Sequence, residues 1–350
     1  MTWTELDWDT LERLRKQFLQ AKPCDGPYWT SRGELASYDV TFGERIGWKW
    51  DAVLDELLMR GWAPSGGAVL DWGCGSGTAG RRVLGRFGPE AFSSLVVWDH
   101  SPVATAFARD AAARKFPGLA VSEATPGYLG GRDPIGLLVV SHVLNELHPS
   151  RLDEIRALVA RSRAVLWTEP GTRETSRALG SLRDEWSRDF HVIAPCTHGN
   201  PCPVFAPANV RHWCHHFAAP PSWIYADSDW VKFGQRAGID LRSLTYSFMA
   251  LDRDWSPDGA GLSRVIGRPE HFKPYARLLN CDAGGLSELT VMKRDNAALY
   301  KELDRARHPL VYRWTRDGSK ITGGSAPDKP AASLNARVPQ SPIDEARKPS

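Results

Sequence analysis

The sequence has no hydrophobic run long enough to cross a lipid bilayer. Its longest apolar stretch, residues 135–140, has the length of a β-strand, whereas a membrane helix needs about 20 residues. The N-terminal region lacks the continuous apolar segment of a signal peptide, and its acidic residues are not typical of a transit peptide. These acidic residues are Glu5, Asp7, Asp9 and Glu12. We therefore expect a cytoplasmic protein without a cleaved leader and without a membrane partner.

The sequence has a small net charge and few cysteines. The 350 residues carry a formal charge of +3, which is too small a global excess to identify a nucleic-acid partner by itself. Only six cysteines occur, and in a reducing compartment they are not expected to form a disulfide framework. If such cysteines cluster in the sequence, they indicate a metal site or a catalytic group.

From residue 68 onward, short apolar runs alternate with stretches of helical length. The runs AVLDWG, SLVVWD, LAVSEA, IGLLVVSH and AVLWTEPG predict parallel strands connected by crossover helices. Apolar residues at helical spacing predict that the preceding 60 residues are mainly helical. A strand at 241–251 and a hairpin at 275–294, with Gly284 and Gly285 in its turn, then predict an antiparallel end to the same sheet.

A glycine-rich loop follows the first predicted strand directly. Its glycines are Gly73, Gly75 and Gly77. Glycine at this place lets the backbone N–H groups approach a bound nucleotide, while Thr78 replaces the third glycine of an NAD-type loop. Asp71 precedes the loop as in class I methyltransferases, and Asp99 ends the next strand, where a carboxylate accepts ribose hydroxyls. The pattern predicts an S-adenosylmethionine (SAM) half-site, with a glycine turn that binds nothing as the alternative.

The residues after the fourth predicted strand do not identify a catalytic group. Amino methylation of bases commonly uses Asn or Asp followed by Pro-Pro and an aromatic residue there, but this sequence reads SHVLNEL at 141–147. His142, Asn145 and Glu146 are polar residues near the carboxyl end of the strand, where open α/β sheets bind ligands. Two interpretations stay open: His142 and Asn145 line the cofactor pocket, or Asn145 and Glu146 simply begin the next connection.

Three cysteines fall in one Pro- and His-rich segment, and a fourth lies at the later hairpin. Cys196, Cys202 and Cys214 have the spacing C-x5-C-x11-C, and Cys281 is far downstream. Four thiolates suit a tetrahedral zinc ion or an iron–sulfur cluster, and the spacing does not separate the two. Histidines of the segment are further candidate zinc ligands. Free thiols in a loop and a catalytic Pro195–Cys196 pair are the remaining alternatives.

A group of basic residues precedes the predicted hairpin. The group consists of Arg264, Arg268, His271, Lys273 and Arg277. Such a group neutralises phosphates when it lies on one surface, and it is an ordinary solvated loop when it does not. Both interpretations stay open at the level of the sequence.

Taken together, these motifs resemble the methyltransferase-like Rsm family of small-ribosomal-subunit assembly factors, which occurs in mitochondria and bacteria. The motifs are VLDWGCGSGT at 69–78, SHVLNEL at 141–147, EPGT at 169–172, APC-x5-CP at 194–203, WCHHF at 213–217, LNCDAGGL at 279–286 and VMKR at 291–294. The resemblance implies a SAM-type pocket and a 4Fe-4S cluster held by Cys196, Cys202, Cys214 and Cys281. It also implies binding to small-subunit rRNA, and we expect no DNA partner.

The expected architecture is an α/β class I methyltransferase-like (Rossmann-like) sheet with an N-terminal helical region and an irregular metal-binding insert. We expect the helical region at 1–60, the methyltransferase-like domain at 61–310, a cysteine-rich iron–sulfur insert at 191–220 and a disordered tail at 317–350. The expected cofactor residues are Asp71, Gly73, Gly75, Gly77, Asp99, His142 and Asn145. The leading function is a factor in ribosome assembly and translation, and the resemblance leaves open whether it is an enzyme. An active rRNA methyltransferase and a zinc-containing small-molecule methyltransferase are the alternatives.

Overall fold

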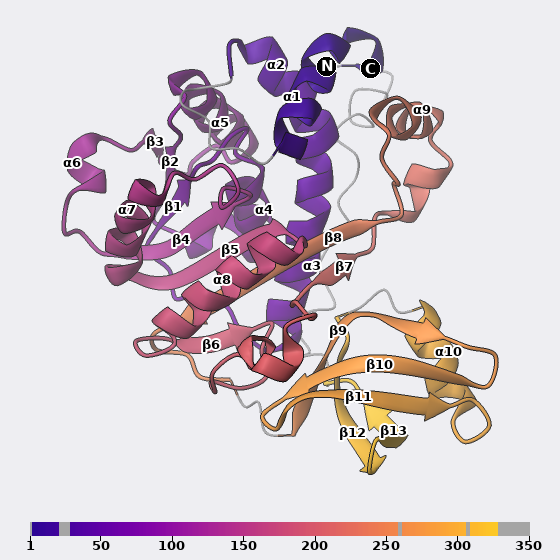
Figure 1. The fold of residues 1–350 in the computed structure, drawn as a ribbon. Coiled ribbons are helices and arrows are strands. Elements are labelled where there is room, and N and C mark those ends of the chain that lie inside the picture. The colour runs from indigo at the N-terminus through magenta and orange to yellow at the C-terminus, as the bar shows by residue number, and fades with distance from the viewer. Residues whose placement is uncertain (1, 21–28, 258–260, 306–308, 328–350) are drawn as a thin grey trace.

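The computed structural model describes residues 2–20, 29–257, 261–305 and 309–327. These residues form an N-terminal helical part, a central sheet covered by helices, and a C-terminal β-barrel (Figure 1). Most of the expected disordered tail, residues 328–350, lies outside the described residues, so disorder there stays a prediction.

The N-terminal part is helical, as the apolar spacing predicts. It contains η1 (Trp3–Glu5), α1 (Trp8–Gln20), α2 (Arg32–Tyr38), the π-helical turn η2 (Asp39–Gly43) and α3 (Glu44–Met59). Helix α3 is the most deeply buried of these, because Trp50, Leu54 and Leu57 pack into the core on one face of the sheet. These helices are therefore packed onto the sheet domain, and α3 forms part of its core.

The central sheet has eight strands. They are β1 (Ala68–Trp72), β2 (Ser94–Trp98), β3 (Val121–Glu123), β4 (Ile135–Ser141), β5 (Ser162–Pro170), β6 (His191–Ala194), β7 (His216–Ala218) and β8 (Leu244–Asp252). Seven lie in the order β3-β2-β1-β4-β5-β8-β6, and β7 also pairs with β8. Strands β1 to β5 are parallel, whereas β8 is antiparallel to β5, β6 and β7. This order with one reversed strand is that of a class I methyltransferase sheet, so the expected class I methyltransferase-like sheet is confirmed.

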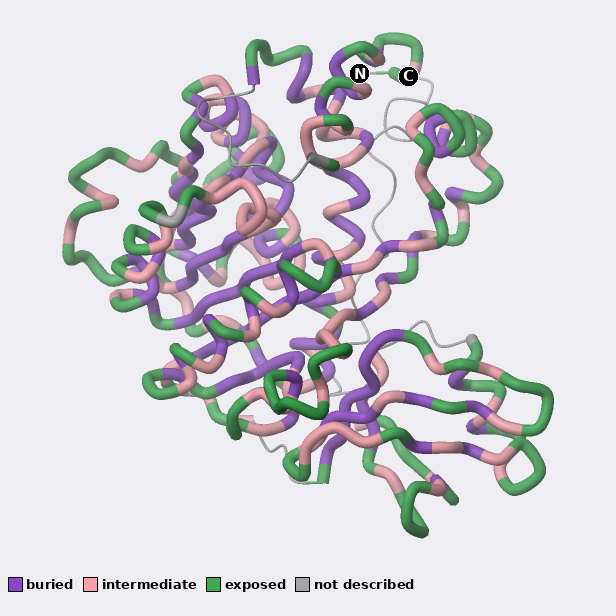
Figure 2. The backbone as a smooth tube through the Cα atoms, viewed as in Figure 1, coloured by how far each residue is buried: buried purple, intermediate pink, exposed green. Residues whose placement is uncertain are grey.

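Helices cover both faces of the sheet. Helices α3, α4 (Thr78–Phe87) and α5 (Pro102–Lys115) pack on one face, and α7 (Pro149–Ala160) and α8 (Arg173–Trp186) pack on the other. Neighbouring strand residues such as Val69 and Leu70 belong to opposite cores, which is why the strands read as continuous apolar runs. Figure 2 shows that the central strands are mostly buried. The shorter α6 (Pro126–Leu129) follows β3, and α9 (Ser228–Ala237) precedes β8. No helix in the described ranges is long and apolar enough to span a bilayer.

The predicted hairpin at 275–294 exists, but it does not end the central sheet. It is formed by β10 (Tyr275–Asp282) and β11 (Gly285–Met292), which join β9 (Leu262–His271), β12 (Val311–Asp317) and β13 (Lys320–Ser325) in a closed barrel (Figure 1). Helix α10 (Ala297–Arg305) packs Leu299 and Leu303 into the barrel core. The reversed strand of the central sheet is β8 alone. Its nearly continuous burial suits a central position, whereas β10 alternates between buried and exposed residues.

Three expected boundaries change as a result. The methyltransferase-like domain, expected over 61–310, ends with β8, because β9 to β13 form the barrel. The tail expected from residue 317 is wrong for residues 320–325, which form β13 and pair with β11 and β12. The cysteine-rich segment at 191–220 is not irregular throughout, because β6 and β7 near its ends join the central sheet.

One buried carboxylate joins the helical part, the cysteine-rich segment and the barrel. Glu56 of α3 accepts hydrogen bonds from Arg60 Nη2 at 2.8 Å and from Arg264 Nη2 of β9 at 2.6 Å. All three side chains are almost completely buried. Arg60 also donates to the carbonyl groups of Pro195 and Cys196 at 2.8 and 2.9 Å. Three segments that are distant in the sequence therefore meet at a single negative charge.

We expect the substitution Glu56→Gln to destabilise the protein strongly. It leaves two buried guanidinium groups without a counter-charge, so the free energy of unfolding should fall by about 3–5 kcal/mol. Urea denaturation followed by circular dichroism measures this loss. The control is Glu12→Gln, since Glu12 pairs with Arg236 at the surface and should cost less than about 1 kcal/mol. Equal losses for the two variants would contradict the central role of Glu56.

Candidate functional site

A cavity of about 940 Å³ lies at the carboxyl ends of β1, β2 and β4. Its lining includes Gly73, Gly75, Trp98, Asp99, His142 and Asn145 from the sheet domain. Phe18 of α1, Tyr38 of α2 and Lys49 of α3 line it from the N-terminal part. This is the edge at which open α/β sheets bind their ligands. We refer to it as the strand-end cavity.

The three loop glycines have positive φ angles of +69°, +50° and +79° for Gly73, Gly75 and Gly77. A Cβ atom at Gly73 would lie 2.7 Å from the Val143 side chain, and one at Gly77 would lie 2.8 Å from Ala108. These two positions therefore need glycine for both conformation and packing. A Cβ atom at Gly75 would meet nothing within 4 Å, so the backbone at Gly75 faces open space of the strand-end cavity.

The two carboxylates of the expected half-site have different places. Asp71 is fully buried behind the loop, where its Oδ2 accepts from the Gly80 N–H at 2.9 Å, and burial raises its pKa to about 7. Asp99 lines the strand-end cavity, and its Oδ2 accepts from the Gly75 N–H at 2.9 Å. Burial raises the pKa of Asp99 as well. Asp71 and Gly77 thus support the loop, while the other five expected cofactor residues line the cavity.

Buried polar atoms of the lining residues Arg45 and Asn145 have no hydrogen-bond partner among the described residues. They are Nη1 of Arg45, a donor, and Oδ1 of Asn145, an acceptor. Buried polar groups are rarely left unpaired, so such atoms indicate a missing polar ligand. A ligand that carries both an anionic group and a donor would satisfy them.

A chain of hydrogen bonds reaches the cavity from α3. Trp50 Nε1 donates to Ser141 Oγ at 2.9 Å, and Ser141 Oγ lies 3.1 Å from His142 Nδ1. The other ring nitrogen of His142, Nε2, lies 3.2 Å from Lys49 Nζ. His142 has a φ of +56°, which is unusual for a residue other than glycine and is often found at functional sites.

Burial changes the acid–base properties of this chain. Burial and, to a smaller extent, nearby Arg45 lower the pKa of Lys49 to about 8. Burial raises the pKa of Glu169, at the end of β5, to about 7, although hydrogen bonds from Trp167, Val143 and Leu144 oppose the rise. The amine of Lys49 can therefore exchange a proton near neutral pH, as a general base requires.

The sequence interpretation missed Lys49 and Glu169. Lys49 lies on α3 between two buried tryptophans, Trp48 and Trp50, and four residues before the buried Val53. A lysine on the apolar side of a predicted helix was the available signal. Glu169 had a similar signal, because it interrupts an apolar strand just before its carboxyl end.

The thiols of the four expected ligand cysteines lie near enough to interact electrostatically, and we call this group the cysteine site. Cys196 follows β6, Cys202 precedes η4 (Pro203–Phe205), Cys214 precedes β7, and Cys281 lies in β10. Burial raises the pKa of Cys214, and the three other thiols raise it further. Burial and nearby Cys196 likewise raise the pKa of Cys202 to about 12. Thiolates at these positions would repel one another, and a bound cation would relieve this repulsion.

The cysteine site does not form a compact single-ion centre. Among the described residues, no three His, Cys, Asp or Glu side chains lie close enough to hold one metal ion. The histidine contacts are limited to pairs, with Cys214 Sγ 3.6 Å from His216 Nε2 and Cys281 Sγ 3.8 Å from His198 Nε2. The cysteines in the described ranges are free thiols.

Two arginines place positive charge beside the cysteine site, and each is also paired with a carboxylate. Nε and Nη1 of the buried Arg264 have no hydrogen-bond partner among the described residues, and the guanidinium acts to lower the pKa of Cys214. Arg183 of α8 interacts with the thiols of Cys196 and Cys202, which raise its pKa against the effect of burial. Besides burial, Asp184 and Asp282 raise the pKa of Cys202 and Cys281, so the charges around the thiols have both signs.

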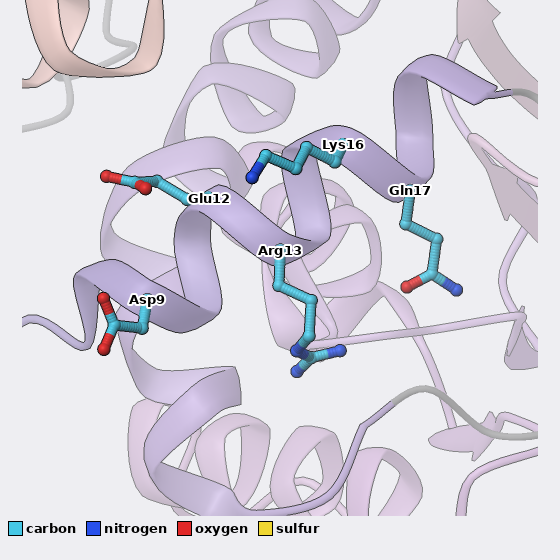
Figure 3. Close-up of a pocket in the computed structure, with 5 residues that line it drawn as sticks. All are labelled: Asp9, Glu12, Arg13, Lys16 and Gln17. Carbon is cyan, nitrogen blue, oxygen red and sulfur yellow. The ribbon is translucent and has the colours of Figure 1, made fainter.

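A shallow hollow on α1 does not have the features of a functional site (Figure 3). It is lined by Asp9, Glu12, Arg13, Lys16 and Gln17, which all come from this one helix. Arg13 pairs with Glu34 and Glu12 pairs with Arg236, so two of the lining side chains have structural roles. The strand-end cavity and the cysteine site are the stronger candidates.

The sheet order and the glycine loop at the strand-end cavity define a class I methyltransferase-like protein. A family model described as "Mitochondrial small ribosomal subunit Rsm22" matches residues 51–311, and the chain therefore belongs to this family. The resemblance inferred from the motifs is confirmed. A comparison with curated protein sequences finds no match.

Several solved structures are similar to this chain at low scores. The N-methyltransferase NodS from Bradyrhizobium japonicum, in complex with S-adenosyl-L-homocysteine, has 14% identity and a TM-score of 0.38, covering 69% of this chain and 98% of its own. Magnesium protoporphyrin IX methyltransferase from Synechocystis, with the same ligand, has 13% identity and a TM-score of 0.38, covering 70% and 97%. Because these scores are low, the fold assignment rests on the strand order.

We expect Glu169 to make stability depend on pH. Its pKa in the folded protein, about 7, lies above the ordinary value of 4.5. Its contribution to stability is therefore complete below pH 4.5 and is lost as the pH rises through about 7. Glu169→Gln keeps the acceptor oxygen but cannot titrate. Its free energy of unfolding should therefore fall less steeply with pH than that of wild type, with a difference in slope of up to about 1.4 kcal/mol per pH unit. Urea denaturation between about pH 5 and pH 8 measures the difference.

The control for this experiment is Glu185→Gln, because Glu185 is an exposed carboxylate paired with Arg156. Its folded pKa is lowered, chiefly by the hydrogen bond from Arg156, so the sign of its pH dependence is opposite. Identical pH profiles for wild type and Glu169→Gln would show that Glu169 does not titrate in this range.

Proposed function

We propose that the protein is a SAM-binding, iron–sulfur assembly factor of the small ribosomal subunit that contacts its rRNA. The observation that carries the proposal is the Rsm22 family match over residues 51–311, which includes the glycine loop and Asp99 of the strand-end cavity and the four cysteines of the cysteine site. The name of that family refers to the small ribosomal subunit. A role at the ribosome is therefore the simplest function that accounts for both sites.

The strand-end cavity has the polar groups that SAM requires. The carboxylate of Asp99 is placed to accept the ribose hydroxyls, which is the usual role of an acid at the end of the second strand. The unpaired Nη1 of Arg45 suits the carboxylate of the methionine moiety, and Oδ1 of Asn145 suits its ammonium group. Glycine at position 75 leaves room for close approach.

The cysteine site suits a 4Fe-4S cluster better than a zinc ion. In a cubane cluster each thiolate binds a different iron, so the four sulfur atoms stand farther apart than the ligands of one zinc ion. This agrees with thiols that interact electrostatically without forming a compact group of three. With four thiolate ligands, a 4Fe-4S cluster has a net negative charge, which Arg264 and Arg183 would offset.

A cluster held by Cys196, Cys202, Cys214 and Cys281 would link the end of β6, the following loop, β7 and the barrel. When bound, it supplies a rigid covalent connection, together with the capacity to exchange an electron. Metal ligation would thus complete the folding of a segment in which few apolar side chains are buried. We infer that its main role here is structural.

We expect protein purified without oxygen to contain about four iron and four sulfide ions per chain. It should also co-sediment with precursors of the small ribosomal subunit at low salt. The substitution Cys214→Ser should remove most of the iron and weaken co-sedimentation, because the cysteine-rich segment loses a ligand. Iron and acid-labile sulfide analysis and gradient centrifugation measure both effects.

The matched control is Cys74→Ser, a buried thiol in the glycine loop that is not part of the cysteine site. This variant should keep its iron. Stoichiometric zinc in place of iron would contradict the cluster, and wild-type protein that fails to co-sediment would contradict the ribosomal role.

A second candidate function, methyl transfer, is favoured by the hydrogen-bond chain that ends at Lys49. SAM, when bound, supplies an electrophilic methyl group. A nitrogen or oxygen acceptor would form a bond to the methyl carbon as the S–CH₃ bond breaks, and neutral Lys49 would take the proton that the acceptor loses. Because Lys49 lines the strand-end cavity, it is placed to reach such an acceptor.

The hydrogen-bond chain can follow the protonation of Lys49 by moving hydrogen atoms alone. Neutral His142 has one donor and one acceptor nitrogen. If Lys49 is charged, it donates to Nε2, and Nδ1–H donates to Ser141. If Lys49 is neutral, Ser141 donates to Nδ1, and Nε2–H donates to the amine. Trp50 donates to Ser141 Oγ in both cases.

We expect Lys49→Met to lower methyl transfer to small-subunit rRNA by roughly 10²–10⁴-fold while SAM affinity stays within about threefold. The wild-type rate should rise with pH and level off above about 8, since neutral Lys49 is the active form. Labelled SAM measures transfer, and isothermal titration measures affinity. Asp99→Ala is the comparison variant that should lose SAM binding itself. Unchanged transfer in Lys49→Met, or none in wild type, would contradict the catalytic role.

A further inference from the structure

The barrel has the strand order of an OB-fold. If β9 to β13 are counted as strands one to five, their order around the barrel is 1-2-3-5-4, and strands three and five are parallel. Helix α10 lies between strands three and four. OB-folds bind oligonucleotides or oligosaccharides on strands two and three and on the loops that join strands one to two and four to five. The corresponding surface here is formed by β10, β11 and the loop at 272–274.

The charge of the barrel favours an anionic ligand. Residues 262–325 contain twelve Lys and Arg residues against seven Asp and Glu residues, a formal charge of +5, whereas the whole chain has +3. The remainder of the chain is therefore slightly acidic. Of the basic residues noted in the sequence, Arg264 is buried against Glu56 and faces no ligand at this surface. Arg268, Lys273 and Arg277 are exposed.

Aromatic and basic side chains alternate at the free end of β10. The rings of Phe272 and Tyr275 stack at 4.8 Å, and Phe272 is 40% exposed. The guanidinium of Arg277 lies 5.7 Å from the Phe272 ring and also pairs with Glu270 of β9. We call Phe272, Lys273, Tyr275 and Arg277 the barrel platform. Figure 2 shows the exposure of the barrel backbone.

The cysteine-rich segment covers the other end of the same surface. Cys281 pairs with Leu286 at that end, η4 packs against β11, and Arg211 lies 3.5 Å from Glu288. Asn200 also donates to the carbonyl group of Ala283. The cysteine site therefore closes one end of the β10–β11 face and leaves the barrel platform open at the other.

We propose that the barrel platform binds single-stranded RNA, with unpaired bases stacked on Phe272 and Tyr275 and phosphates held by Lys273 and Arg277. Exposed ring faces suit unpaired bases, because bases inside a duplex are already stacked on one another. The proposal rests on the proposed function, since it names the surface through which the rRNA partner is held. It does not depend on SAM or on catalysis.

The test uses the full-length holoprotein and a fluorescein-labelled oligouridine of roughly 12 nucleotides, within the site size of an OB-fold. Fluorescence anisotropy at low salt should show binding. The double variant Phe272→Ala/Tyr275→Ala should bind roughly tenfold or more weakly, because two stacking surfaces are lost. Lys273→Glu should weaken binding and reduce its dependence on salt by about one ion.

Two control variants lie outside the barrel. Tyr225→Ala removes an aromatic side chain that is 45% exposed in η6 (Ser222–Tyr225), and Arg156→Ala removes an exposed, ion-paired arginine of α7. Both should bind the oligonucleotide as wild type does. A thermal melt of each variant shows whether the barrel is intact, and Lys273→Glu, at an exposed loop position, tests the surface without touching the core.

Binding of duplex RNA of the same length as tightly as oligouridine would overturn the proposal. So would platform variants with wild-type affinity, or wild-type protein that does not bind the oligonucleotide. Co-sedimentation with subunit precursors separates the two proposals. If wild-type protein co-sediments with the precursors while the platform variants bind oligouridine with wild-type affinity, only the platform proposal fails. If co-sedimentation is absent while oligouridine binding still requires the platform, only the ribosomal role fails.

Discussion

The carboxylate of Glu56 is the interaction on which the arrangement of the molecule depends. It is fully buried between Arg60 and Arg264, so the three charged groups need one another far more than exposed groups would. Through Arg60 it fixes the carbonyl group of Cys196, and through Arg264 it fixes the barrel and places positive charge beside Cys214. The geometry of the cysteine site therefore depends on a helix that contributes no cysteine to it.

The strand-end cavity and the cysteine site are connected through the central sheet. Glu169, behind the cavity, is the register partner of Ser247 on β8, and Ser247 donates to the carbonyl group of Cys214 at 3.0 Å. Ser247 thus lies between Glu169 and the backbone of Cys214. Helix α3 supplies Lys49 to the strand-end cavity and Glu56 to the ion pairs with Arg60 and Arg264, so the same helix supports both sites.

Local patterns predicted some elements correctly but did not reveal which sheet they join. The hairpin at 275–294 has the expected turn, yet its strands β10 and β11 pair with β9 and β13, and not with β8. The strands beyond residue 310 were not recognised because they bury few side chains, chiefly Val311, Tyr312 and Ile321. A barrel closes by pairing its edges, so a strand can be stable with little apolar surface of its own.

The sequence by itself determined the parallel strands, the glycine loop with Asp71 and Asp99, and the four cysteines as one candidate ligand set. These features follow from local spacing and from the chemistry of single residues. Only the tertiary structure decided that Lys49 meets His142, 93 residues away, and that Glu56 pairs with Arg264, 208 residues away. No local rule specifies which buried charges will share a site, because that choice is set by long-range packing and by the cost of leaving any of them unpaired.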